Sequence, residues 1–382
     1  MLSPRPFVVV IALTALAACP TPAGGEGERD GDACDVVVPA TWIAPDWEAH
    51  AVEALALRAQ LDTLTGATTM RGAELSTAGV VVDDIGDLTG PFQAGALSLQ
   101  TITSANTNGV VSDAFAEFLE LLAAGPQSLV DAGGQWAPGA SGGLYGSSPR
   151  GINEGGLEMR QIVDKSLFAG SFYAYALALT AGAIDVATID AISAAWGNNS
   201  KLDPTLVLAD SADYTHAMGF HAEAVGSLIA ARAYAADAAC NGERDAAIVA
   251  FFRTWEKSMY ARFVHYANVC AVEAAAADDD DGFAGAIHEL SEGAGLALGF
   301  HGLANPASGP LAGGARVVTD AQLEVMMTTI GVDIADLGAS TTGALVSQTV
   351  FDGPVTTLEG LVGAALSLDV AEVDGFAEPT EG

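Results

Sequence analysis

Basic side chains are scarce in this sequence. It contains 14 Lys and Arg against 48 Asp and Glu, so the formal net charge at pH 7 is −34. Binding to nucleic acid or to an anionic membrane surface requires clustered Lys and Arg. We therefore expect no nucleic-acid partner. The acidic balance is typical of a surface that keeps a protein dispersed in solution.

Cysteine is also rare, with four residues, and no two of them form a Cys-x-x-Cys pair. That absence argues against a zinc ribbon and against a thioredoxin-type redox motif. Cys240 and Cys270 lie near the ends of successive predicted helices, on the order of 40 Å apart along a continuous helix. They can pair only if the second helix breaks, and the disulfide state of Cys34, Cys240 and Cys270 stays open.

No apolar run reaches the roughly 20 residues that cross a bilayer as a helix. Phe7–Ala18 is unbroken apolar sequence after a start whose only charged side chain is Arg5, which is the layout of a secretory signal. Leu167–Ala183 is apolar but adjoins Asp164 and Lys165. We interpret it as the centre of a large helical bundle.

The end of the apolar start reads Leu16-Ala17-Ala18-Cys19. This resembles the lipobox of bacterial lipoproteins, which implies that residues 1–18 are removed and that the Cys19 thiol carries a diacylglycerol. Pro20 is not the Asp associated with inner-membrane retention in some bacteria. We therefore expect a protein of the cell envelope, at the outer membrane, that contacts the membrane only through its lipid anchor.

The rest of the chain has helical periodicity. We predict a flexible tether over residues 19–45, a single all-α domain over 46–375 and a disordered tail over 376–382. Residues 131–151, rich in Gly, Ser and Pro, are predicted to be a long loop, and Asn241-Gly242 a turn. The predicted fold is a bundle of long antiparallel helices. The predicted helices are 47–64, 112–124, 154–181, 211–240, 243–276, 283–300, 320–331 and 355–369.

Three strings come close to known functional motifs. Gly139–Gly143 fits G-x-S-x-G, but no strand precedes it to form a nucleophile elbow. Asp278–Asp281 with Gly282 resembles a calcium loop, but acids are missing at the first and twelfth positions, and we expect the run to cap a helix. His288–Glu292 differs from H-E-x-x-H at one position, where Glu292 replaces the second His. A carboxylate can still bind zinc.

Four segments together resemble a family of bacterial cell-envelope lipoproteins known only as a domain of unknown function. They are NEGGLEMRQIVDKSLFAG at 153–170, Glu223–Gly226, WEKSMYARFVHYANVC at 255–270 and AIHELSEGAGL at 286–296. The resemblance covers roughly residues 50–335 and implies an all-α fold in the cell envelope, with no established activity. A more distant likeness is to imelysin-type helical proteins, which are linked to iron uptake and marked by Gly-x-His-x-x-Glu. Gly219-Phe220-His221 begins that motif, and Ala224 stands in place of its Glu.

Glu158, Gln161 and Lys165 are spaced to share one face of a helix that is otherwise apolar. Buried polar groups need partners, and this face can find them on neighbouring helices. The set is either a network that fixes helix register or a small-molecule or metal pocket between helices. The candidate partners are Glu223, Glu256, His265, His288 and Glu292.

These observations leave three hypotheses for function, and none assigns a catalytic residue. The first is a lipid-anchored helical protein that binds a ligand without catalysis, through Glu158, Gln161, Lys165, Glu223, Glu256 and His265. The second is a metal-dependent protein, for iron handling or an imelysin-like peptidase, with iron or zinc at His288, Glu292 and His221. The third is a structural or protein-interaction role for the acidic surface and the 131–151 loop.

Overall fold

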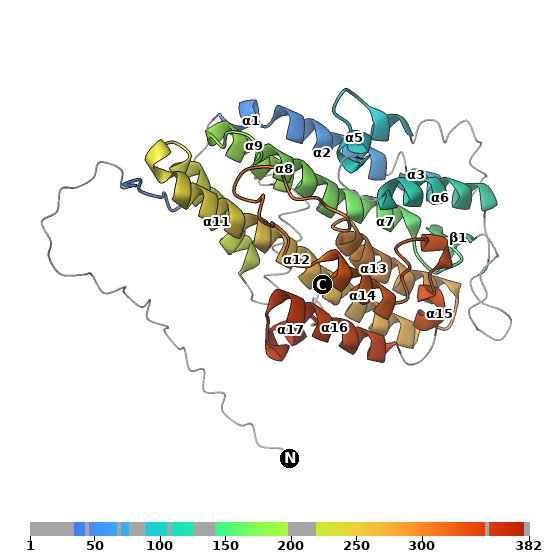
Figure 1. The fold of residues 1–382 in the computed structure, drawn as a ribbon. Helices are drawn as coiled ribbons and strands as arrows, with labels where there is room; N and C mark the ends of the chain where they lie inside the picture. The colour runs from blue at the N-terminus through green and yellow to red at the C-terminus, as the bar shows by residue number, and fades with distance from the viewer. Residues whose placement is uncertain are drawn as a thin grey trace, which may run out of the picture. The chain divides into compact units, whose positions relative to one another are not determined.

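The computed structural model describes residues 34–42, 46–66, 70–75, 89–104, 109–125, 128, 142–197, 219–347 and 351–377. The predicted signal peptide, Cys19 and residues 139–141 of the G-x-S-x-G string lie outside these ranges. The described residues are mostly helical, with one sheet of two short strands (Figure 1). The all-α prediction is confirmed at this level.

The helix α12, Asn241–Ala276, is the central element. Its 36 residues span about 54 Å at 1.5 Å per residue. It packs against α11, Phe220–Tyr234, and α13, Asp280–Leu298. The Asp279 side chain accepts a hydrogen bond of 2.9 Å from the backbone N–H of Gly282, so the predicted acidic cap of this helix is confirmed.

The predicted helix 154–181 consists of three pieces. They are α7, Met159–Ser166, a π-helical turn η1, Leu167–Ser171, and α8, Phe172–Leu179. Gly170 in η1 faces Gly299 at the end of α13 so closely that a Cβ on Gly170 would collide with the Gly299 carbonyl. Two glycines therefore allow the two backbones to touch, which fixes α7 against α13.

The N-terminal helices pack on the other side of α7 and α8. The predicted helix 47–64 is interrupted at Ala51. Gly125 ends the helix α6 with a φ of 71°, as a glycine after an apolar run predicts. The helix α9 was not predicted; its N-cap, Asp185, accepts a hydrogen bond from the Thr188 backbone. These helices are α1 Trp47–His50, α2 Val52–Thr65, α3 Met70–Leu75, α5 Leu99–Ser104, α6 Val110–Ala124 and α9 Val186–Trp196.

A β-hairpin occupies part of the predicted 131–151 loop, which corrects that prediction. β1, Gly143–Tyr145, pairs antiparallel with β2, Arg150–Ile152. Tyr145 and Ile152 are fully buried, and the Asp281 side chain accepts a hydrogen bond of 2.5 Å from the Ser147 backbone N–H in the turn. Burial and this contact from α13 stabilise strands too short for their periodicity to be recognised.

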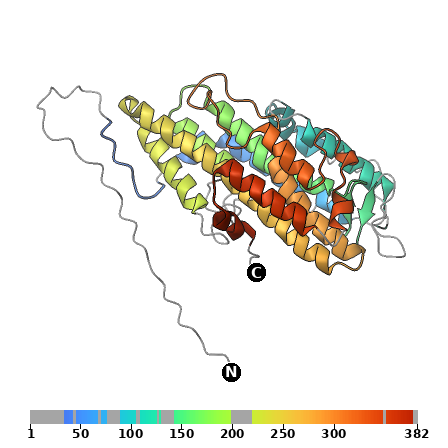
Figure 2. The same ribbon diagram turned by 60° about the horizontal axis from the view of Figure 1, so that its bottom comes forward.

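The C-terminal helices cover α12. α14, Asp320–Thr329, starts with a capping box formed by Thr319 and Gln322. α16, Asp352–Leu366, packs against α12 and α14 (Figure 2). α17, Val370–Ala377, contains the fully buried Phe376, so this helix continues past the predicted domain boundary at residue 375. The short elements between them are η3 Leu337–Ala339 and α15 Thr342–Val346.

A disulfide joins Cys34 to Cys240, and Cys270 is a buried free thiol. Cys240 ends a short 3-10 turn, η2, Ala238–Cys240, directly before α12. The turn predicted at Asn241-Gly242 is therefore wrong: those residues begin α12, and the chain reverses over 235–240. The disulfide attaches Cys34, which lies within the predicted tether 19–45, to the start of α12.

No helix within the described ranges is both long enough and apolar enough to cross a membrane. The predicted apolar stretch Leu167–Ala183 lies among these residues, and Leu167, Phe172 and Tyr173 are buried within the protein.

Candidate functional site

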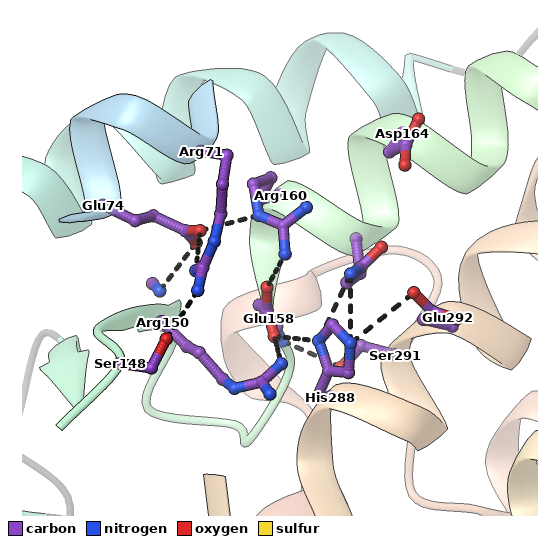
Figure 3. Close-up of polar contacts among 12 residues, drawn as sticks. Arg71, Glu74, Ser148, Arg150, Glu158, Arg160, Asp164, His288, Ser291 and Glu292 are labelled. Carbon is purple, nitrogen blue, oxygen red and sulfur yellow. Dashed lines mark hydrogen bonds and ion pairs between the residues drawn. The ribbon is translucent and has the colours of Figure 1, made fainter. Parts of the chain in front are cut away.

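Glu158 lies at the centre of a buried polar cluster between α7, α13 and the β-hairpin (Figure 3). Its Oε1 accepts a hydrogen bond of 2.8 Å from Arg160, and its Oε2 lies 2.7 Å from His288 Nδ1 and 3.3 Å from Arg150 Nη1. Its backbone N–H donates to Ser291 Oγ at 2.8 Å. Burial alone raises its pKa, but the hydrogen bond and charge of His288, with the charges of the two arginines, lower the pKa to about 2.

Glu74 is a second fully buried carboxylate in the same cluster. It accepts hydrogen bonds from Arg160 Nε at 2.6 Å, Arg71 Nη1 at 2.9 Å and the Gly151 backbone N–H at 3.0 Å. Burial, with the nearby charge of Glu158, raises its pKa in spite of these partners. Arg160 therefore joins two buried acids, and their charges raise its pKa against the effect of burial.

His288 connects the buried acids to the edge of the cluster. Its side chain is 18% exposed, and its Nε2 lies 3.6 Å from Glu292 Oε1. Gln161 Nε2 lies 3.2 Å from Nδ1 and 3.4 Å from Nε2 of the same ring. Gln161 is buried, and its Oε1 has no hydrogen-bond partner among the residues that the structure describes, so the amide approaches the ring through its nitrogen.

Glu292 and Lys165 form the partly exposed end of the cluster. Lys165 Nζ lies 3.4 Å from Glu292 Oε1 and 3.8 Å from Asp164 Oδ2. Burial alone raises the pKa of Glu292, but the charges of Lys165 and His288 lower it below its usual value. Burial raises the pKa of Asp164, and the charge of Lys165 only partly opposes this.

These contacts form a continuous chain in which basic and acidic side chains alternate. Each carboxylate that they include touches at least one cationic group, and His288 lies between two acids. Such pairing is what buried charges require. The members, in order of contact, are Arg71, Glu74, Arg160, Glu158, His288, Glu292, Lys165 and Asp164.

The cluster is poorly suited to hold a metal. Two guanidinium groups contact Glu158 and an ammonium group contacts Glu292, so a cation would be repelled. Within the described ranges, no group of three or more His, Cys, Asp or Glu side chains is arranged to hold a metal ion. His288 and Glu292 lie together, but His221 is elsewhere, stacked on Trp196 with ring centroids 5.9 Å apart.

The structure brings together Glu158, Gln161, Lys165, His288 and Glu292, and it places the remaining candidates elsewhere. Glu223 is exposed on α11. Glu256 is buried on α12, where it accepts hydrogen bonds from Arg316 and the backbone of Val317 and Val318. His265 is buried beside Tyr266, with ring centroids 5.7 Å apart. Glu256 and His265 therefore lie on α12, outside the Glu158 cluster.

Five charged residues of the cluster, Asp164 among them, were not predicted as site residues. Arg160 is only two positions from Glu158, which precedes α7 in extended backbone, so helical spacing gave no signal of their contact. Arg71 and Glu74 have the i, i+3 spacing of a helical ion pair, but they lie in a stretch with weak periodicity. Arg150 stands in the predicted loop, where nothing in the sequence indicates its contact with Glu158.

A second site is a groove between α6, α14 and residues 331–339. It comprises cavities of about 640 and 380 Å³ that share Asp113, Ile334 and Ala335 in their walls. Burial, together with the charges of Asp336, Glu120 and Glu154, raises the pKa of Glu117, although a hydrogen bond from Asn153 opposes this. The acidic residues lining the groove are Asp113, Glu117, Glu120, Glu324, Asp333 and Asp336.

No family model, curated protein or solved structure matches this chain. The resemblance to the envelope lipoprotein family therefore depends on the four sequence segments alone.

Proposed function

We propose that the chain is a lipid-anchored protein of the cell envelope, attached through Cys19 at the outer membrane, that acts by binding a ligand. The disulfide between Cys34 and Cys240 is the observation that supports the proposed location. Structural disulfides form and persist outside the reducing cytoplasm. This support is independent of the lipobox-like sequence at residues 16–19, and the two agree.

We infer further that the long helices form an antiparallel bundle on a short tether. Residues 277–279 alone connect α12 to α13, and the two helices pack together. Such short connections favour antiparallel neighbours. With Cys34 fixed to the start of α12, only residues 20–33 separate the domain from the anchored cysteine.

The acidic groove is the better candidate for the ligand surface. Cavities of this size are suited to small molecules or to a segment of a partner, and six acidic side chains line them. The alternating charges around Glu158 are already paired with one another. We therefore assign the Glu158 cluster a structural role and the groove a ligand with positive charge, such as a polyamine or a basic peptide segment.

The metal-dependent hypothesis has less support. The carboxylates nearest His288 are engaged by Arg150, Arg160 and Lys165, which compete with any metal for their oxygens. A structural or assembly role remains compatible with the groove if the ligand is a basic segment of a partner protein.

Metabolic labelling with palmitate tests the anchor. The wild-type protein and a Cys270→Ala variant should both incorporate label, and Cys19→Ala should not. The Cys270 variant is the matched control because its thiol is buried in the domain. Label retained by Cys19→Ala would rule out the anchor.

A further inference from the structure

The Cys34–Cys240 disulfide joins a partly exposed residue to a fully buried one. Cys240 has 0% exposure, whereas Cys34 begins a segment, residues 34–42, in which no residue is buried. We call this segment the strap. It lies beside the end of α11 (Figure 1), with Val37 88% exposed. An attacking thiol therefore reaches the sulfur of Cys34 more easily than that of Cys240.

Apart from the disulfide, the strap contacts the domain through Trp42, which packs against the hydrophobic core. The guanidinium of Arg232 lies 5.6 Å above the Trp42 ring, and both side chains line a small hollow of about 40 Å³ together with Pro39 and Ile229. Within the described part of the chain, residues 35–42 make no hydrogen bond to another element. The disulfide at one end and the packing of Trp42 at the other therefore attach the strap to the domain.

Cys240 is placed to act as the leaving group. It occupies the N-cap position of α12, where the positive end of the helix dipole stabilises a thiolate. A more stable thiolate leaves faster in thiol–disulfide exchange. The two cysteines thus differ in both respects that decide the direction of attack, because Cys34 is accessible and Cys240 is the better leaving group.

We propose that the Cys34–Cys240 disulfide is a site of thiol–disulfide exchange with an extracytoplasmic dithiol protein, and that the exchange opens at Cys34. A reductant thiolate attacks Cys34 Sγ; the S–S bond breaks and its electron pair leaves on Cys240 Sγ. The second thiol of the reductant then attacks its own sulfur in the mixed disulfide and releases Cys34. The protein disulfide gains two electrons and two protons, and the dithiol is oxidised to a disulfide.

The exchange changes the length of the tether, a consequence that rests on the proposed anchor at Cys19. With the disulfide closed, residues 20–33 separate the anchor from the domain, and with it open the first held residue is Trp42. At about 3.4 Å per extended residue the maximum reach rises from roughly 48 Å to roughly 75 Å. Reduction thus lets the domain and its groove move farther from the membrane.

Cys270 does not compete in this exchange. It is buried between α12 and α13, and burial raises the pKa of its thiol well above the usual value. A neutral, inaccessible thiol is a poor nucleophile. The residue therefore serves as an internal control for selective reaction.

The direction of attack can be tested by trapping. The oxidised mature protein is incubated with a thioredoxin-type protein whose second, resolving cysteine is replaced by Ser, and the mixed disulfide is mapped by peptide mass spectrometry. We expect capture on Cys34 in the wild type and in Cys270→Ser alike. Capture on Cys240, or capture only after the protein is unfolded, would overturn the proposal.

Release of the strap can be tested by limited proteolysis with elastase, which cuts after small residues such as those in Val36–Ala40. We expect faster cleavage there in the reduced wild type and, without reductant, in Cys34→Ser than in the oxidised protein, in which both ends of the strap are held. Circular dichroism should show that reduction leaves the helices folded. An equally resistant strap, or loss of the helices on reduction, contradicts release. None of these measurements needs the lipid, so a failed palmitate experiment leaves this result standing.

Discussion

Glu158 Oε2 and His288 Nδ1 lie 2.7 Å apart, although the N-cap of α7 and this residue of α13 are separated by 130 positions. This contact joins the start of α7, and through Arg150 the β-hairpin, to the middle of α13. Its geometry explains why the polar residues of α7 can be buried. They complete ion pairs that connect three elements.

Replacing Glu158 with Gln should destabilise the fold strongly. The variant keeps the size of the side chain but removes the charge that faces Arg150, Arg160 and His288. Breaking a buried ion pair costs about 3–5 kcal/mol because the partner charge is left uncompensated. The free energy of unfolding, measured in urea, should fall by this amount. Glu223→Gln, on the exposed face of α11, is the matched control and should change it by less than about 0.5 kcal/mol. Equal effects of the two variants would contradict the assigned role.

The same carboxylate predicts how stability depends on acid. The pKa of Glu158 is lowered to about 2 from a usual 4.5, so the folded state favours its charged form. Its contribution is fully present above pH 4.5 and is lost as the pH falls towards 2. A shift of this size corresponds to roughly 3 kcal/mol. Glu292, whose pKa is also lowered, acts in the same direction.

Urea titrations between pH 6 and pH 2 check this dependence. Over that range Glu158→Gln should lose roughly 3 kcal/mol less stability than the wild type, because it lacks the carboxylate whose pKa is lowered. Parallel curves for the two proteins would show that Glu158 titrates normally. Glu74 does not produce this loss, because its pKa is raised and protonation at low pH favours its folded state.

Metal content separates the binding hypothesis from its metal-dependent rival. We expect protein purified from cells grown with ample iron and zinc to carry neither metal in stoichiometric amount, because cationic side chains engage the acids around His288. Elemental analysis of the wild type and of His288→Ala makes the test. Stoichiometric metal that disappears in the variant would establish the rival.

The elements predicted correctly were those whose signals are local. Asp279 precedes Gly282 at a cap spacing, and Gly125 follows an apolar run, so both helix ends could be recognised without tertiary information. The interruption at η1 could not, since it depends on Gly170 meeting Gly299 across two segments. The hairpin was missed for a similar reason: three-residue strands have no measurable periodicity, and this pair is stabilised by contacts with α6 and α13.

The cluster was predictable only in part. Helical spacing placed Glu158, Gln161 and Lys165 on one face, and it placed His288 and Glu292 on one face of another helix. Spacing within a helix does not say which helices are neighbours. That is why Glu256 and His265, on α12, were grouped with the site although α13 is the helix that packs most closely on α7, and why Arg71 and Glu74 were left out.

The acidic groove predicts binding of cations that depends on salt. Asp113 on α6 and Glu324 on α14 both line the cavity of about 640 Å³, so replacing them with Asn and Gln removes two charges from opposite walls. Spermine binding, measured by calorimetry at low ionic strength, should weaken about tenfold in this double variant, corresponding to about 1.4 kcal/mol. It should also weaken in the wild type as salt is added, because exposed charges are screened.

A double variant of Glu48→Gln and Glu243→Gln removes the same charge from exposed positions outside the groove and should bind like the wild type. Equal weakening in both double variants would mean that spermine responds to net charge alone, and the groove would then lose its assignment.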